Sequence, residues 1–471
     1  GEFIIDGGSI KGNTARMPGG GVYLGKGSSL TLRGGTIEDN EARRGGGLMA
    51  ENGSSLVMEA GLVARNRAFW GGGIALAQDC AFTMRGGEIS ANSATQGGGL
   101  WMEDSKFTLS GQGLITENSA QEYGGGVYAG ENRIFVLEGG AVSYNHAGKY
   151  GGGMYIRGTD STFYFFEGGS LNNNTADGSG GGLYSEYAKW ILSGPDIRAN
   201  TAGDSGGGAA FSGGSCGFRA GSVSGNTAEA SGGGVYILGS ASFTCEGGIL
   251  HGNSAGDKGG GVSVEDGNFF MAAGEISGNA ADSGGGLYLG TGRNGTSGTS
   301  TMNGGIIRDN QARSGGGIEV TRRLLTLGGN AIVSGNHAQR FGGGVYVFLN
   351  FFSQEFSSAV FLTLEGNAAI SGNTSQKFGG GVYVNSSRFL MTGGSISWNT
   401  AEEYGGGVVA ADWGAGGGVP VRDEFVLQAG SITGNSAPKG GGVYVTEDAD
   451  FKYPFTGSLV VSNEPEDIYR E

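Results

Sequence analysis

Cysteine, proline and long apolar runs are scarce in this sequence. The 471 residues include 3 cysteines and 6 prolines. Three cysteines are too few for a small scaffold held together by disulfides. The missing Gly-X-Y period excludes collagen, even though 105 residues are glycine. No apolar run approaches the roughly 18 residues of a membrane span, so we predict no transmembrane segment.

Basic residues are also outnumbered. The chain has 29 Lys and Arg residues against 44 Asp and Glu residues, and its formal net charge is −15. An acidic surface repels phosphate backbones, so we predict no nucleic-acid partner. Hydrophobic residues make up 37% of the chain and stand at fixed positions, which argues against disorder.

What the sequence has in abundance is glycine at a nearly fixed interval. Most of the intervals between successive GGG triplets are 25 to 29 residues, and three are longer, at 31, 37 and 35. Self-similarity at such a period is typical of solenoid proteins. The triplets that open the 16 repeats begin at Gly19, Gly45, Gly71, Gly97, Gly124, Gly151, Gly180, Gly206, Gly232, Gly259, Gly284, Gly315, Gly342, Gly379, Gly405 and Gly440.

Each repeat carries three apolar pieces that are too short for helices and of the right length for strands. In the first repeat they are Val22 with Leu24, Leu30 with Leu32, and Ile37 alone. Alternate residues of a strand face the same side. No helical segment is available to cover a flat sheet, so the chain must wind around its own apolar faces. We predict an all-β fold, a right-handed parallel β-helix (β-solenoid) with three short strands per rung and about 16–17 rungs of about 26 residues.

An asparagine follows the third apolar piece in every repeat, as at Asn40 and Asn66. Asparagine tolerates the left-handed conformation that a sharp turn needs. Stacked asparagines can also hydrogen-bond along the solenoid as an amide ladder. Both properties favour a structural role over a row of ligand-binding amides.

The alternation of "GGGVY" at Gly232–Tyr236 with "ISGN" at Ile276–Asn279 resembles the repeats of chlamydial polymorphic outer-membrane proteins and of related autotransporter passengers. Those proteins alternate GG-aliphatic tetrads with F-x-x-N tetrads, and here an aliphatic residue replaces the phenylalanine. The resemblance spans almost the whole chain. It implies a right-handed β-helix, a bacterial cell-surface or extracellular location, and a role as an adhesin or scaffold.

We expect residues 1–471 to form a single β-helix domain. Residues 1–18 match the second half of a repeat, which predicts a partial first rung of a longer chain. Residues 454–471 carry a degenerate repeat with proline and charge, which predicts a C-terminal cap. The three long repeats gain residues between the first and second pieces, at about 290–301, 348–361 and 411–424.

These insertions belong to nearby repeats, so they crowd one edge of the solenoid, and insertions on one face often make the binding face. An alternative is that the loops cover the solenoid's own flank. Tyrosines after the first apolar residue form a second candidate. They either stack on sugar rings or, as we favour, stack on each other between rungs. The candidate ligand-binding residues are Phe348, Phe351, Phe352, Phe356, Trp413, Tyr346 and Tyr383.

The three histidines, His146, His251 and His337, stand three or more repeats apart, too far to share an active site. We therefore expect a non-enzymatic adhesin or scaffold that binds a host or matrix protein or a glycan. A polysaccharide-binding or polysaccharide-degrading protein is the alternative, and an end-to-end filament subunit is the third. No cofactor is expected. An acidic stripe between the asparagines and the triplets could offer oxygen ligands to calcium, although we favour a solvated face.

Overall fold

The computed structural model describes residues 1–131, 134–158, 163–291, 298–348, 361–411, 424–453 and 458–471. The chain divides into two compact units. Unit 1 comprises Gly1–Glu229 with Gly234–Tyr236, and unit 2 comprises Ala230–Gly233 with Ile237–Glu471. The prediction of one domain stays a prediction. No helix of the described residues is long and apolar enough to cross a membrane.

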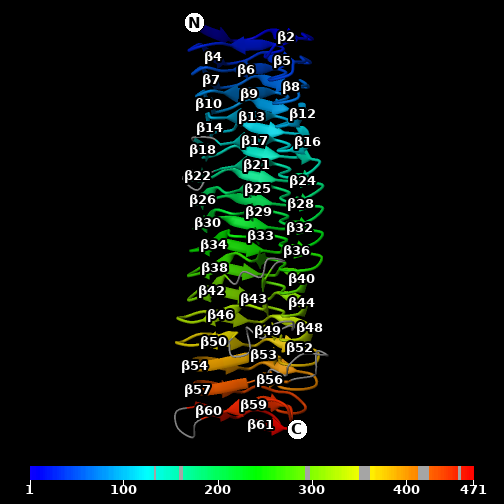
Figure 1. Ribbon diagram of the computed structural model, residues 1–471, viewed down its shortest axis with the longest axis vertical. Helices are drawn as coiled ribbons and strands as arrows, with labels where there is room; N and C mark the ends of the chain where they lie inside the picture. Colours follow the sequence, from blue (N-terminus) through cyan, green and yellow to red (C-terminus); the bar gives the residue numbers. More distant parts are fainter. Residues whose placement is uncertain (132–133, 159–162, 292–297, 349–360, 412–423, 454–457) are drawn as a thin grey trace. The chain divides into compact units, whose positions relative to one another are not determined.

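Each unit is a coil of short parallel strands in which every turn repeats the same order (Figure 1). One turn of unit 1 runs through β13 (Leu100–Glu103), β14 (Lys106–Leu109) and β15 (Leu114–Thr116). These strands pair in parallel with β17 (Val127–Gly130), β18 (Ile134–Leu137) and β19 (Ala141–Ser143) of the next turn. The three predicted strands per rung are confirmed. A fourth segment, β16 (Ser119–Tyr123), pairs with β20 (His146–Ala147) and was not predicted.

The strands that follow the glycine triplets form one face of each unit and carry the residues discussed below. In unit 1 they are β3 (Val22–Leu24), β6 (Leu48–Ala50), β9 (Ile74–Ala77), β13, β17, β21 (Met154–Arg157), β25 (Leu183–Glu186) and β29 (Ala209–Ser212). In unit 2 they are β37 (Val262–Glu265), β41 (Leu287–Gly290), β45 (Ile318–Thr321), β49 (Val345–Phe348), β53 (Val382–Asn385), β56 (Val408–Ala410) and β58 (Val443–Val445). β61 (Ile468–Arg470) pairs with β58 on the same face, although no triplet precedes it.

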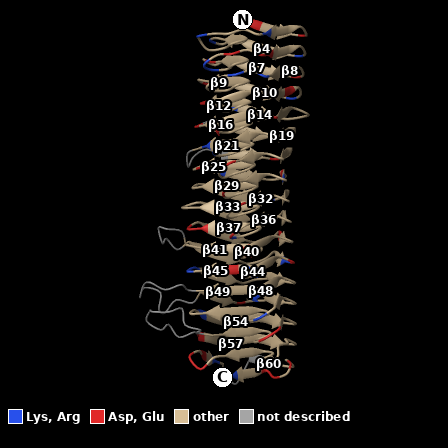
Figure 2. Cartoon of the chain, turned by 90° about the vertical axis from the view of Figure 1, so that its right-hand side faces the viewer, with Lys and Arg blue, Asp and Glu red and all other residues tan. Residues whose placement is uncertain are grey.

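Alternate residues of the strands fill the interior of each coil. In β14 the side chains of Phe107 and Leu109 are fully buried, whereas Lys106 is exposed. Phe107 lies between Phe82 and Phe135 of the neighbouring turns, with ring centroids 5.1 and 5.5 Å apart. The charged residues colour mainly the turns, while the strands are largely uncharged (Figure 2). The predicted inward alternation is confirmed.

The recurrent asparagines form a buried amide ladder in each unit, as predicted. Oδ1 of Asn118 accepts hydrogen bonds from the backbone N–H and from Nδ2 of Asn92, each 3.0 Å long. Nδ2 of Asn92 also donates to the carbonyl of Val63 at 2.9 Å. This pattern continues from Asn13 to Asn226 in unit 1 and from Asn253 to Asn463 in unit 2. The Asn92 amide is therefore fully hydrogen-bonded and links the preceding turn to the following one.

One part of the asparagine prediction was wrong. The asparagine does not adopt the left-handed conformation, because the residue before it does. Ala91 has φ of 53° and Glu117 has φ of 57°, immediately before Asn92 and Asn118. The residue with positive φ is therefore exposed, whereas the side chain of the following asparagine is buried. Residues of several types occupy this position, each at the energetic cost of a positive φ.

The triplet glycines are required by close backbone approach. A Cβ on Gly98 would lie 2.4 Å from the carbonyl oxygen of Gly125 and 2.5 Å from that of Ser119. Both distances are well below van der Waals contact, so a side chain here would push neighbouring turns apart. The first glycine of that triplet, Gly97, also has a positive φ of 65°.

Unit 2 carries the three long repeats. The extra residues stand between β41 and β42 (Thr299–Met302), between β49 and β50 (Leu362–Leu364), and between β56 and β57 (Glu424–Thr433). This is the predicted place, between the first and second strands. The bounds predicted for these insertions were slightly too wide, because Gly290, residues 299–301, Phe348 and Glu424 belong to the flanking strands. At the end of unit 2 the last ladder residue, Asn463, donates to Asp467 Oδ1 from its backbone and side chain, at 3.0 and 2.9 Å. The cap proposed for residues 454–471 stays a prediction.

Cys80, Cys216 and Cys245 are all free thiols with buried side chains. Their inward positions agree with the alternation of the strands. Burial raises the pKa of the Cys245 thiol to about 12, so this group is neutral and unreactive at ordinary pH.

Candidate functional site

The outer face of the triplet-following strands carries an aromatic column in unit 1. Tyr128, Tyr155 and Tyr184 occupy the same register position in β17, β21 and β25. Their ring centroids are 5.3 and 5.6 Å apart, and the rings are within 8° of parallel. A second set of rings, just before the triplets, packs beside them, with Tyr150 at 4.6 Å from Tyr184. The stacking between rungs that we favoured is confirmed.

Unit 2 carries a similar column, which includes three of the predicted ligand-binding residues. Tyr346 stacks on Tyr383 at 5.4 Å and on Phe348 at 5.9 Å. The side chain of Tyr346 is 7% exposed and that of Tyr383 is 1% exposed, whereas Phe348 is half-buried. Phe378 stacks on Tyr404 at 5.3 Å.

Stacking of this kind leaves few aromatic faces free for a ligand. A sugar packs against the flat face of a ring, but the faces of Tyr155 are covered by rings of both neighbouring turns, and Tyr346 and Tyr383 cover each other. Burial also raises the pKa of Tyr184 to about 12, which agrees with a hydroxyl in an apolar surrounding. We conclude that the aromatic columns mainly cover and stabilise the outer face of the strands. Ligand binding by Tyr346, Tyr383 and Phe348 stays a prediction.

The other predicted ligand-binding residues lie outside the described part of the chain. Phe351, Phe352 and Phe356 fall in the segment 349–360, and Trp413 falls in the segment 412–423. The insertion hypothesis therefore stays a prediction as well.

The carboxylates of the acidic stripe considered for calcium contact other protein side chains. Asp204 accepts a hydrogen bond from Ser179 at 3.0 Å, Asp257 lies 3.7 Å from Lys258, and Asp282 lies 3.6 Å from Arg313. Within the described residues, no group of three or more His, Cys, Asp or Glu side chains is placed to hold a metal ion.

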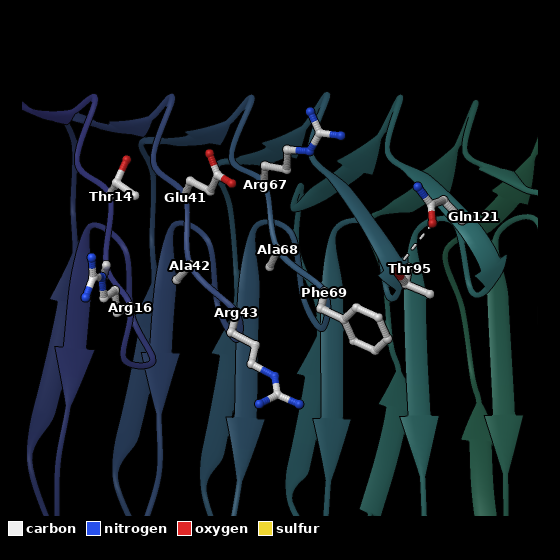
Figure 3. Close-up of a pocket in the computed structure, with 11 residues that line it drawn as sticks. Thr14, Arg16, Glu41, Ala42, Arg43, Arg67, Ala68, Phe69, Thr95 and Gln121 are labelled. Carbon is white, nitrogen blue, oxygen red and sulfur yellow. Dashed lines mark hydrogen bonds between the residues drawn. The ribbon is translucent and has the colours of Figure 1, made fainter.

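A hollow lies on the flank of unit 1, over the turns that follow the ladder asparagines (Figure 3). We call it the arginine groove. It has a volume of about 460 Å³ and is open to solvent. The residues that line it are Thr14, Ala15, Arg16, Glu41, Ala42, Arg43, Arg67, Ala68, Phe69, Thr95 and Gln121.

The lining residues come from two columns that the parallel pairing brings together. Thr14, Glu41 and Arg67 follow the ladder asparagines directly, and their backbones bridge from turn to turn. The second column stands two residues further along the chain and comprises Arg16, Arg43, Phe69, Thr95 and Gln121. Neighbouring turns lie about 4.8 Å apart. The second column thus presents a row of side chains along the unit, over five successive turns.

The groove is basic, in contrast to the chain as a whole. Arg16, Arg43 and Arg67 are exposed, and among the described residues no carboxylate pairs with any of them. Glu41 is the acidic residue of the lining, so the groove has a formal charge of +2. Arg43 also lies over the ring of Trp70, 5.3 Å from its centroid. Unpaired guanidinium groups in a concave surface form a site for carboxylate, sulfate or phosphate groups.

An exposed aromatic ring stands among these arginines. Phe69 is 47% exposed and meets Trp70 edge to face, with centroids 4.5 Å apart and planes at 78°. Unlike the rings of the columns, Phe69 has no parallel ring stacked on it among the described residues. Further along the groove, the hydroxyl of Thr95 lies 3.4 Å from Oε1 of Gln121, so the far end is neutral and polar.

The sequence predictions missed this groove. Its signal is present in the sequence, because Arg16, Arg43 and Phe69 each stand three residues after a ladder asparagine. The signal becomes visible only when the repeats are aligned on that asparagine and the neighbouring turns are known to pair in register.

The comparison with protein families agrees with this architecture. Residues 1–112 match the family model described as a right handed beta helix region. The fold is a right-handed parallel β-helix. The predicted fold class is therefore confirmed. Of the residues that line the arginine groove, all except Gln121 fall within the matched region.

No curated protein and no solved structure matches the chain. The finer resemblance to chlamydial polymorphic outer-membrane proteins and autotransporter passengers stays a prediction.

Proposed function

We propose that this β-helix is a non-enzymatic extracellular scaffold that attaches to acidic glycans through the arginine groove of unit 1. The observation that carries the proposal is the presence of three exposed arginines, Arg16, Arg43 and Arg67, which have no carboxylate partner among the described residues. In a chain with a net charge of −15, three arginines gathered in one hollow without carboxylate partners among the described residues call for a functional explanation.

The shape of the groove favours a linear ligand. Because Arg16, Arg43, Phe69, Thr95 and Gln121 follow one another on successive turns, an extended polymer would meet charge first, then an aromatic face, then neutral polar groups. An acidic polysaccharide offers all three features in each repeat. Its carboxylates or sulfates would bind the arginines, a sugar face would pack on Phe69, and its hydroxyls would reach Thr95 and Gln121.

This proposal places the protein outside the cell, and a bacterial surface is the location that the sequence resemblance favours. An acidic net charge keeps such a scaffold soluble, while a local basic groove restricts attachment to one surface. A host or matrix glycan is the partner class that we propose, and the β-helix supplies a rigid support for the groove.

The test is binding of the full chain to two soluble probes, heparin for sulfate and polygalacturonate for carboxylate. We expect at least one of them to bind, and the affinity to fall steeply as the salt concentration rises. The triple variant Arg16→Gln, Arg43→Gln and Arg67→Gln should weaken binding by roughly tenfold or more, because each lost charge-assisted hydrogen bond contributes about 1.5–3 kcal/mol before screening.

A matched control removes the same charge elsewhere on unit 1. Arg33, Arg65 and Arg198 are exposed and ion-paired, with Asp6 and Glu59, with Asp39, and with Asp196 respectively. Their triple glutamine variant should bind as the wild type does. Equal loss in both triple variants would show a nonspecific charge effect and would contradict the groove, as would unchanged binding by the groove variant.

A further inference from the structure

A single tryptophan stands out on the surface of unit 2. Trp398 follows β54 (Arg388–Ser397) and directly precedes the ladder residue Asn399. Its side chain is 72% exposed. Large aromatic side chains that contribute to stability are normally buried, as Trp190 is in unit 1. Burial of its ring therefore does not account for Trp398.

The backbone at Trp398 is also strained. Its φ is 58°, in the left-handed region that side chains rarely adopt. In unit 2 the equivalent position is glycine in most turns, at Gly252, Gly278, Gly335, Gly372 and Gly434. Placing a bulky residue in this conformation costs on the order of 1 kcal/mol. Strained residues that persist at exposed positions are candidates for function.

Glycines occupy the equivalent position in the two neighbouring turns, and only one of them lies against the indole. A Cβ on Gly434 would lie 2.8 Å from Cε3 and 2.9 Å from Cζ3 of Trp398, so the ring covers the backbone of the next turn. A Cβ on Gly372, in the preceding turn, would meet nothing within 4 Å. Among the described residues no aromatic ring stacks on Trp398. The indole therefore rests on one glycine and keeps a face open to solvent.

A row of hydroxyl groups runs next to this ring. Ser371 pairs in register with Ser397, and Ser397 pairs in register with Thr433, so the three stand on consecutive turns. Each directly precedes the strained position of its turn and is partly exposed. Within the described part of the chain, their side-chain hydroxyls make no hydrogen bond to protein. They are therefore free to bond to a ligand.

We propose that Trp398 and the hydroxyl row of Ser371, Ser397 and Thr433 bind a neutral sugar unit of a polysaccharide. The indole would pack against the C–H face of the sugar ring, and the three side chains would exchange hydrogen bonds with its hydroxyls. Uncharged sugars are the class that fits, because this surface combines a flat aromatic face with hydroxyls. This site is independent of the arginine groove and goes beyond the proposed function.

The experiment measures retardation of the full chain in native gels that contain neutral polysaccharides. The probes are hydroxyethyl cellulose, a soluble β-1,3-glucan and a galactomannan. We expect retardation by at least one of them, and we expect it to be insensitive to salt, unlike binding of acidic glycans by the arginine groove. Trp398→Ala should weaken binding by roughly threefold to tenfold, as expected for the loss of one aromatic stacking contact.

Two further variants separate binding from folding. Trp398→Gly removes the ring but suits the positive φ, so it should fold with unchanged or higher thermal stability and still lose binding. Tyr144→Ala changes an exposed aromatic residue in the same turn position of unit 1, where φ is 54°, and should bind as the wild type does. Failure of all probes to bind, unchanged binding by both Trp398 variants, or equal loss in Tyr144→Ala would each overturn the proposal.

Discussion

The outer aromatic columns of the two units differ in continuity. In unit 1 the column runs through Trp101, Tyr128, Tyr155 and Tyr184 on successive turns without a break. In unit 2 the register places Glu319 between Tyr288 and Tyr346. The Glu319 side chain is 7% exposed, its Oε2 has no hydrogen-bond partner, and Ser283 is a hydrogen-bond partner of the carboxyl group. Unit 2 therefore buries an ionisable group where unit 1 buries a phenol ring.

The exposed turn before the ladder asparagine differs between the units as well. Unit 1 places Asp39, Arg65, Ala91, Glu117 and Tyr144 in the left-handed conformation, whereas unit 2 uses glycine in most turns. The two ladders themselves have the same hydrogen bonds. The comparison teaches that the interior fixes the fold in both units, and that the outer positions are free to carry strain, charge and binding groups.

The largest expected effect concerns Glu319. Burial raises the pKa of this carboxyl from 4.5 to about 8; the hydrogen bond with Ser283 and the charge of Lys258 oppose the rise, and the nearby Asp282 and Asp257 add to it. In the unfolded chain the carboxyl ionises near 4.5, whereas in the folded protein it holds its proton up to about pH 8. Unfolding therefore releases a proton between these values, and the stability of unit 2 falls as the pH rises from about 4.5 to about 8, by about 3–5 kcal/mol.

Hydrogen exchange of peptides from β45 at pH 5 and pH 9, corrected for intrinsic rates, measures this change. Glu319→Gln cannot ionise and should abolish most of the pH dependence, while Glu103→Gln, at an exposed position of β13 in unit 1, should leave it intact. Stability in unit 2 that is constant with pH in the wild type would contradict a buried protonated carboxyl.

The next prediction concerns the asparagine ladder, which both units share. Asn118→Ala in unit 1 and Asn373→Ala in unit 2 each remove a buried amide that donates to a backbone carbonyl and to the next ladder residue. The amide's own oxygen accepts two hydrogen bonds from the preceding ladder residue. We expect each variant to destabilise its own unit by about 3 kcal/mol, since buried donors and acceptors lose their partners.

The measurement is local hydrogen exchange, because solenoids need not unfold in a single step. Asn367→Ala, which removes an exposed asparagine outside the ladder, serves as the control. A large difference between Asn118→Ala and Asn373→Ala would show that the two ladders are not equivalent.

The β-helix could be predicted because its determinants are local and repeated. The triplets, the alternating aliphatics such as Leu30 and Leu32, and the asparagines all recur at a fixed spacing. The fourth short segment was missed because it carries only one buried alanine per turn, as at Ala120 in β16. A single small apolar residue gives no alternation to detect.

The candidate sites were harder to predict because they depend on register and accessibility. Arg43 and Phe69 are unremarkable in sequence and become neighbours only across paired turns. The tyrosines were correctly placed on the outer face, but sequence could not show that neighbouring rings cover their faces. Trp398 was not singled out, because we expected the left-handed conformation at the asparagine. In the structure it is the preceding residue, here Trp398, that adopts this conformation.

Removing a stacked ring from the unit 1 column should change stability less than ionising the buried carboxyl of unit 2. Tyr155→Ala removes a ring that is 6% exposed and stacked on both sides, and we expect it to destabilise unit 1 by about 2 kcal/mol. Tyr155→Phe keeps the ring and should lose less than half of that. Urea unfolding followed by tyrosine and tryptophan fluorescence provides the measurement, and equal losses in the two variants would show that the hydroxyl matters more than the stacking.

The smallest expected effect comes from exchanging the turn residues between the units. Gly372 has φ of 63°, and a Cβ there would meet nothing within 4 Å, so Gly372→Ala adds backbone strain without any clash. We expect it to destabilise unit 2 by about 1 kcal/mol. The reverse change in unit 1, Ala91→Gly, relieves strain at φ of 53° but increases the entropy of the unfolded chain, and should therefore gain only a few tenths of a kcal/mol. Thermal unfolding of both variants measures these shifts. If Gly372→Ala proved neutral, the turn would tolerate side chains freely, and the strain argument for Trp398 would lose its basis.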